Sequence, residues 1–133
     1  MAVQFSTTVR NAMIDAIEST TGTAPTLEIR SGAAPANCGT AASGTVLATL
    51  VLPSDWLAAA SAGVKTILGT WQDTSADATG TAAHFRINQG ATCHMQGTVT
   101  ATGGGGDMTL DNVSIAAAQS VTITAFTITA GGA

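Results

Sequence analysis

The stretch Thr26-Leu27-Glu28-Ile29-Arg30 decides the fold class, because the spacing of apolar residues changes there from a helical period to strict alternation. Leu27 and Ile29 alternate with Glu28 and Arg30, which predicts a strand with one buried face. The residues before this stretch and the residues after it therefore belong to different kinds of secondary structure.

The segment before this strand predicts the one helix of the chain. Its apolar residues recur at helical spacing and would share one side: Val9, Met13, Ile14 and Ile17. Ser6 or Thr7 caps the start, Thr20-Thr21-Gly22 ends the helix, and Pro25 prevents its continuation. We expect the apolar side to dock onto the rest of the protein, and Asp15 and Glu18 to lie towards the outside.

After Arg30, more short apolar runs follow, separated by turn residues, and together with Thr26–Arg30 they predict about seven or eight strands. The tetrad Gly103–Gly106 predicts a flexible hairpin connection. The last run, Val121–Thr129, changes phase, which indicates a bulge or a strand that crosses from one covered face to another. We therefore predict an all-β fold, a jelly-roll-like antiparallel β-sandwich with a short N-terminal helix. Residues 1–133 would form this single domain, with the N-terminal arm and helix in residues 1–22.

The composition restricts the partners. Charged residues make up only 9% of the 133 residues, against about 25% in a typical soluble protein. With 4 Lys+Arg and a net charge of −4, no basic patch can form, so nucleic-acid binding is not expected. No run of about 18 apolar residues is present, so no membrane span is expected. A weakly charged surface rich in Thr, Ser, Ala and Gly is inexpensive to desolvate, which favours permanent association with other proteins.

No constellation of side chains predicts catalysis, a metal or a cofactor. Cys93 and His94 are adjacent and would point to opposite faces of a strand, so they cannot share a metal ion with His84. Asp107 and Asp111 are expected to cap turns. Cys38 and Cys93 either pair or stay as two buried thiols, and we favour the reduced form.

Four apolar side chains are candidate contacts with a partner: Val3, Phe5, Trp56 and Trp71. Val3 and Phe5 lie in the N-terminal arm, which would either reach a neighbouring subunit or complete the protein's own sheet. Trp is enriched at the centres of interfaces. The simpler interpretation, which we favour, is that Trp56 and Trp71 fill the core.

Four segments resemble small structural proteins of tailed bacteriophages: MAVQFSTTVRNAMIDAIE (1–18), LPSDWLAAASAGVKTILGTW (52–71), TATGGGGDMTLDN (100–112) and SVTITAFTITAGG (120–132). The resemblance covers nearly the whole chain and is associated with the capsid cement, or decoration, proteins of phage heads. It implies a jelly-roll domain on the outer capsid surface of the virion, assembled in the bacterial cytoplasm. It also implies that the major capsid protein is the partner and that the chain forms a dimer or trimer.

Three alternatives stay open at this point. The chain is a tail, head–tail joining or fibre component, or a carbohydrate-binding β-sandwich with Trp56 or Trp71 as a stacking platform. An enzyme is the least expected class, because no reactive cluster is present.

Overall fold

The computed structural model describes residues 2–133, and Met1 lies outside the described residues. The chain forms one helix and mostly short strands: α1 (Thr7–Thr21), β1 (Thr26–Arg30), β2 (Val46–Val51), β3 (Val64–Thr66), β4 (Trp71–Asp73), β5 (Gly80–Thr81), β6 (His84–Gln89), β7 (Thr92–Ala101), β8 (Met108–Leu110), β9 (Ser114–Ile115), β10 (Val121–Ile123) and β11 (Thr127–Thr129).

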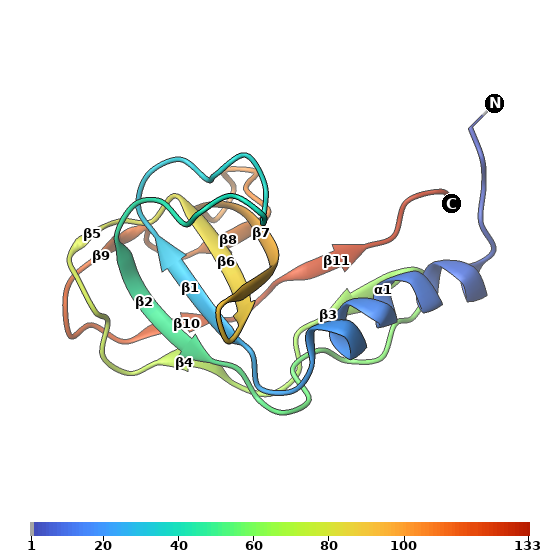
Figure 1. Ribbon diagram of the computed structural model, residues 1–133, viewed down its shortest axis with the longest axis horizontal. Helices are drawn as coiled ribbons and strands as arrows, with labels where there is room; N and C mark the ends of the chain where they lie inside the picture. The colour runs from blue at the N-terminus through green and yellow to red at the C-terminus, as the bar shows by residue number, and fades with distance from the viewer. Residues whose placement is uncertain (1) are drawn as a thin grey trace.

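The strands form a curled sheet with smaller ladders around it (Figure 1). The five-stranded sheet has the order β2-β1-β6-β7-β8, and the two-stranded ladders are β10-β4, β11-β3 and β5-β9. A β-rich fold with one N-terminal helix is confirmed. The jelly-roll-like sandwich, as a more specific arrangement, stays a prediction, as does the single domain over residues 1–133.

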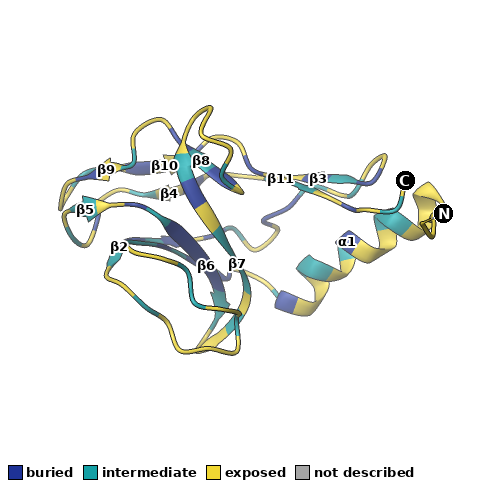
Figure 2. Cartoon of the chain, turned by 90° about the horizontal axis from the view of Figure 1, so that it is seen from above, coloured by how far each residue is buried: buried dark blue, intermediate teal, exposed yellow. Residues whose placement is uncertain are grey.

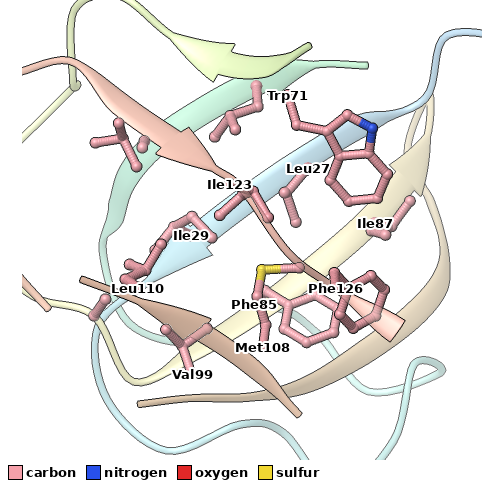
Figure 3. Packing of buried hydrophobic residues seen from close by; sticks show 14 of the residues in the cluster. Leu27, Ile29, Trp71, Phe85, Ile87, Val99, Met108, Leu110, Ile123 and Phe126 are labelled. Carbon is pink, nitrogen blue, oxygen red and sulfur yellow. The ribbon is translucent and has the colours of Figure 1, made fainter. Parts of the chain in front are cut away.

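The core lies on the inner face of the curled sheet (Figure 3). Burial along β1 alternates as predicted, with Leu27 and Ile29 fully buried. Aromatic rings continue the core: Phe126 lies 5.6 Å from Phe85 in an edge-to-face arrangement and 6.1 Å from Trp71, centroid to centroid. Such pairs contribute about 0.5–1.5 kcal/mol beyond the area that they bury, so these few rings hold the sheet and the β4–β10 ladder together.

The connection between β7 and β8 differs from the predicted hairpin. The two strands pair in parallel, with Val99 opposite Met108, although only residues 102–107 connect them. Parallel neighbours usually need a connection of about a dozen residues. Gly103 and Gly105, with φ of 87° and 83°, allow this loop to turn through a full circle, because only glycine enters that region without strain.

The last segment matches one of the two predicted explanations, a crossing, although Val121–Thr129 forms two strands instead of one. β10 pairs with β4 and β11 pairs with β3, so the chain leaves one ladder for another between residues 123 and 127. Phe126 is buried at the crossing and Ala125 is exposed. β11 leads out of the body of the molecule, towards α1 and both ends of the chain (Figure 1).

The prediction of two reduced cysteines is wrong in this structure. Cys38 and Cys93 form a disulfide across a sequence separation of 55 residues. The bond ties the loop 31–45 to β7. Side chains of the sheet hold the same loop, since Gln96 Nε2 donates to the Pro35 carbonyl at 2.7 Å and Arg86 Nη2 donates to the Cys38 carbonyl at 2.8 Å. Spacing along the sequence could not show that the fold brings the two sulfurs together.

Candidate interaction surface

α1 and the β3–β11 ladder form a projection from the body of the molecule (Figures 1 and 2). Ser6 caps α1 as predicted, because its Oγ accepts a hydrogen bond from Val9 N at 3.2 Å. Gly22 ends the helix with a φ of 94°. The boundaries of the helix therefore follow from local sequence signals.

The helix docks through its polar side chains. Three of them accept hydrogen bonds from backbone N–H groups of the segment 57–63: Glu18 Oε2 from Leu57 at 2.6 Å, Asp15 Oδ1 from Ala60 at 3.0 Å and Asn11 Oδ1 from Gly63 at 2.8 Å. The spacing of 11, 15 and 18 places these oxygens on one face of the helix. They satisfy donors at the outer edge of the 57–63 segment, which would otherwise lack partners in the protein.

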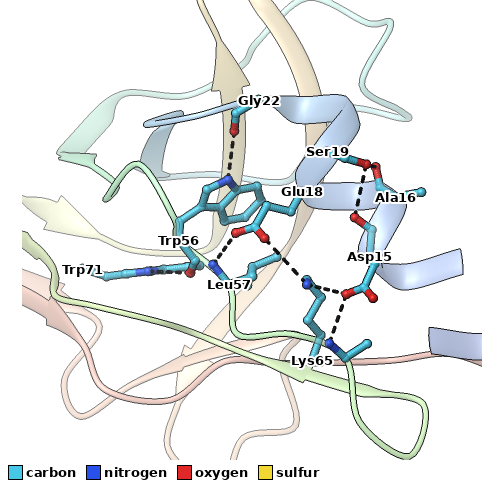
Figure 4. Close-up of polar contacts among 10 residues, drawn as sticks. Asp15, Ala16, Glu18, Ser19, Gly22, Trp56, Leu57, Lys65 and Trp71 are labelled. Carbon is cyan, nitrogen blue, oxygen red and sulfur yellow. Dashed lines mark hydrogen bonds and ion pairs between the residues drawn. The ribbon is translucent and has the colours of Figure 1, made fainter. Parts of the chain in front are cut away.

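A buried lysine completes this contact (Figure 4). The Lys65 side chain is only 2% exposed, and its Nζ lies 2.7 Å from Asp15 Oδ1 and 3.7 Å from Glu18 Oε1. The hydrogen bond from Lys65, supported by the one from the Ala60 N–H, holds the pKa of the Asp15 carboxyl below its usual value. We call the contacts of Asn11, Asp15, Glu18 and Lys65 the polar latch.

The predicted orientation of the helix is only partly correct. Ile14 is buried and Ile17 packs against the core, as expected, but Val9 and Met13 are 45% and 48% exposed. Asp15 and Glu18 contact Lys65, although the Asp15 side chain stays 47% exposed. The physical reason is that Lys65 and the backbone N–H groups of segment 57–63 need hydrogen-bond acceptors. Supplying these acceptors stabilises the protein more than the burial of two apolar side chains would. The helical spacing of the polar residues Asn11, Asp15 and Glu18 was the signal in the sequence from which this orientation could have been predicted.

The outer face of α1 carries no ionisable side chain among the described residues. It consists of exposed residues: Thr8, Val9, Ala12, Met13, Ala16, Ser19 and Thr20. A water-facing helix normally presents charged residues on that side. Here the ionisable residues of the helix, Arg10, Asp15 and Glu18, are half-buried on other sides. The outer face is therefore uncharged and carries two exposed large apolar side chains, Val9 and Met13.

A groove lies beside the C-terminal half of α1. Its volume is about 340 Å³, and its lining is mainly apolar, with Met13, Ile17 and Thr20 on the helix and His94 and Met95 on β7. We call it the helix groove. A larger hollow of about 540 Å³ lies on the side of the polar latch, where Asp15 and Glu18 are already bound to Lys65 and to backbone N–H groups.

The structure separates the four predicted contact residues into two pairs. Val3 and Phe5 are 73% and 42% exposed, so both are accessible to a partner. The N-terminal arm, residues 2–5, runs beside the other end of its own chain, since Phe5 N donates to the Gly132 carbonyl at 2.6 Å.

Trp56 and Trp71 are fully buried, as the favoured interpretation expected. Trp56 Nε1 donates to the Gly22 carbonyl at 3.0 Å, and Trp71 Nε1 donates to the Trp56 carbonyl at 3.2 Å. Neither ring reaches the surface, so the structure offers no face of either ring to a partner protein or to a sugar.

The remaining candidate groups are dispersed or engaged. His84 is fully buried beneath the loop 31–45, with its Nδ1 2.7 Å from the Gly32 carbonyl oxygen. Asp107 Oδ2 accepts hydrogen bonds from Thr98 N and Oγ1 on β7, nine residues earlier, so it bridges to another strand and does not cap its own turn as predicted. Within residues 2–133, no group of three or more His, Cys, Asp or Glu side chains is placed to hold a metal ion. In the same range, no helix combines the length and the apolar character needed to cross a membrane.

No protein-family model, curated protein or solved structure matches the chain. The features that bear on function are therefore those of the molecule itself: the uncharged outer face of α1, the exposed N-terminal arm and the helix groove beside them.

Proposed function

We propose that the chain is a structural protein of the tailed-phage virion, a decoration protein that binds the outside of the head and stabilises contacts between major capsid proteins. The observation that carries this proposal is the exposed apolar surface of the projection. Val3, Phe5, Val9 and Met13 are all more than two-fifths exposed, which leaves the isolated chain with an unfilled protein interface.

The charges of the surface support a role in assembly. The four basic side chains are buried or half-buried, whereas four carboxylates are exposed: Asp55, Asp77, Asp107 and Asp111. Such a surface repels nucleic acid and leaves protein subunits as the natural partners. In this proposal the curled sheet and the β4–β10 ladder are the two layers of a jelly-roll-like sandwich. The core cluster supports this, because Trp71, Val121 and Ile123 of that ladder pack with residues of the sheet.

The rigidity of the body also suits this function. The disulfide holds the loop 31–45 against β7 and joins two cysteines that are 55 residues apart, and a cross-link over that separation contributes about 4 kcal/mol by limiting the unfolded chain. A decoration protein must withstand the same outward pressure as the shell that it holds together. A domain with a cross-linked loop and a dense core transmits such a load without opening.

The test is the copy number of the chain in purified virions, measured by quantitative mass spectrometry against the major capsid protein. Comparable numbers of the two proteins are the expected result. A dozen or fewer copies per particle would favour a tail, joining or fibre component instead, and absence from intact particles would refute a virion role. Particles assembled without the chain should lose their DNA at a lower temperature, with complemented particles as the control.

A further inference from the structure

Polar side chains occupy the face of the five-stranded sheet that is opposite the core, and the loop 31–45 covers them. In the register of the strands, Arg86 of β6 lies opposite Glu28 of β1 and opposite Gln96 of β7. Residues directly opposite one another on neighbouring strands lie on the same face of a sheet. We call this set the polar cluster, and it consists of Glu28, Arg30, His84, Arg86, Asn88 and Gln96.

Hydrogen bonding within the polar cluster is incomplete. Five buried side-chain nitrogen and oxygen atoms lack a partner within residues 2–133, and four of them belong to the cluster: Arg30 Nε, His84 Nε2, Arg86 Nε and Gln96 Oε1. Buried polar atoms in folded proteins are nearly always paired, so a group of unpaired atoms in one place calls for an explanation. The cluster is therefore the part of the body that packing alone does not account for.

Arg86 is a buried cation whose charge no carboxylate neutralises. Only 3% of the residue is exposed, and its Nη2 donates to the carbonyl oxygens of Cys38 at 2.8 Å and Thr40 at 3.1 Å. Glu28 lies across from it, but within residues 2–133 the ion pair of Glu28 is with Arg30, at 3.0 Å. Two arginines and one glutamate leave the cluster with one positive charge. A buried charge is costly unless an opposite charge accompanies it.

A pocket of about 340 Å³ lies beside Arg86. The sheet contributes Glu28, Arg86 and Asn88 to its lining. The rest of the lining is the disulfide and the small residues next to it: Gly39, Thr40, Ala41, Ala42, Gly90 and Ala91. We call it the disulfide pocket. It combines a guanidinium group that lacks a counter-ion with space for a small ligand.

The chemistry of the pocket favours an anion with oxygen acceptors. A guanidinium group is planar and always charged, and its strongest hydrogen bonds are those to phosphate and carboxylate groups. The Glu28 carboxylate opposes such a ligand little, because Arg30 Nη2 and Asn88 Nδ2 both donate to it. The net charge of the chain is −4, which repels an anion at long range. We therefore expect a dissociation constant of about 1 mM.

We propose that the disulfide pocket binds a small oxyanion, a phosphate or a carboxylate group, whose negative charge compensates that of Arg86. The disulfide and the loop 31–45 form walls of the pocket, so the site is in place before the ligand arrives. The proposal is independent of the proposed function, since it depends only on groups within the body of one chain.

The test is a titration of the isotope-labelled chain with inorganic phosphate at constant ionic strength, followed by NMR of the backbone amides. We expect saturable shifts confined to residues 38–42 and 86–93. A parallel titration with acetate identifies the ligand class. Saturation by phosphate alone assigns a phosphate site, saturation by acetate alone assigns a carboxylate site, and saturation by both assigns a site for either group.

Two pairs of variants test the place and the charge of the site. Ala41→Asp adds a negative charge at an exposed residue of the pocket lining and should raise the dissociation constant about tenfold or more. Ala117→Asp, the same change in the exposed turn between β9 and β10, should leave it unchanged. Arg86→Gln should abolish saturation, whereas Arg10→Gln on α1 removes the same charge and should not. The dispersion of each spectrum shows whether the variant folds.

Three outcomes would overturn the inference. The first is the absence of saturation by either anion far above the millimolar range. The second is saturable shifts that lie outside the pocket. The third is equal weakening by Ala41→Asp and Ala117→Asp, which would show a general effect of charge. Because both of these alanines are exposed, this comparison stands even if Arg86→Gln fails to fold.

Discussion

Gly44 shows how a single residue supports the loop that the disulfide closes. Its φ is 70°, and a Cβ at this position would lie 1.8 Å from the backbone oxygen of Ser31. Gly44→Ala should lower the free energy of unfolding by about 1–2 kcal/mol for the left-handed backbone. The clash, which the loop must relieve by moving, should lower it by about 1–3 kcal/mol more.

Gly90→Ala is the matched control for this prediction, measured by chemical denaturation of both variants. Gly90 has a φ of 59°, but nothing lies within 4 Å of the position of its Cβ. Gly90→Ala should therefore lower the free energy of unfolding only by the cost of the left-handed backbone conformation. Equal losses in the two variants would mean that contact with Ser31 does not constrain the loop.

The residues also show what a sequence can predict. The Ser6 cap and the buried Leu27 and Ile29 were predicted correctly, because capping and alternation depend on neighbours in the sequence. The roles of Asp15 and Glu18 were not, because their partners belong to segment 57–65, some 40 to 50 residues away. A polar acceptor on a helix faces the side on which hydrogen-bond donors lie. The pattern of residues within the helix does not show which side that is.

At the scale of the element, the polar latch makes the docking of α1 depend on pH. The Asp15 pKa lies below its usual value of 3.8, mainly because Lys65 donates a hydrogen bond to the carboxylate. A lowered pKa in the folded state stabilises the protein fully above the unfolded value, and this contribution is lost as the pH falls through the folded pKa. The carboxylate of Glu18 and the ammonium group of Lys65 are the charged groups beside Asp15.

We therefore expect Asp15→Asn to melt at a lower temperature than the unmodified chain near pH 6. Below the usual value of 3.8, the difference should shrink as the Asp15 carboxyl of the unmodified chain takes up a proton. Asp111→Asn, a change at an exposed carboxylate on the body, should show no such difference. Melting curves followed by circular dichroism between pH 2 and pH 7 would check this. A difference that persists at pH 2 would show that ionisation of Asp15 does not hold the helix.

The connection between β7 and β8 could not be predicted from its own sequence. The tetrad Gly103–Gly106 has the composition of a hairpin turn, yet it supports the parallel pair of β7 and β8. The same glycines allow both paths, and the choice depends on the burial of Met108 and Leu110 in the core. The phase change in Val121–Thr129 was informative, because a break in alternation has few explanations, and a crossing between two ladders is one of them.

At the scale of the whole molecule, the chain divides into a body and a projection that are held by different forces. Buried aromatic and aliphatic side chains and a disulfide hold the body. The helix of the projection contributes Ile14 and Thr21 as buried residues and packs the half-buried Ile17 against the core, and it relies on the polar latch for its other contacts. Composition alone predicted a single domain and its partner class, but it could not show this division. The division arises because Asn11, Asp15 and Glu18 dock the helix through hydrogen bonds, whereas Val9 and Met13 stay exposed.

This division predicts two levels of protection in native-state amide hydrogen exchange. Polar contacts regain much of their energy from water when they open, so α1 should detach at a lower free energy than the opening of β6 in the sheet. Lys65→Met keeps most of the buried volume but removes the cation between Asp15 and Glu18. It should speed exchange in α1 by about tenfold or more, equivalent to about 1.4 kcal/mol, and should leave β6 unchanged. If α1 and β6 exchanged at one common free energy in both proteins, the helix would be an integral part of the body. A helix of that kind would not be a separable element that polar contacts hold on the body.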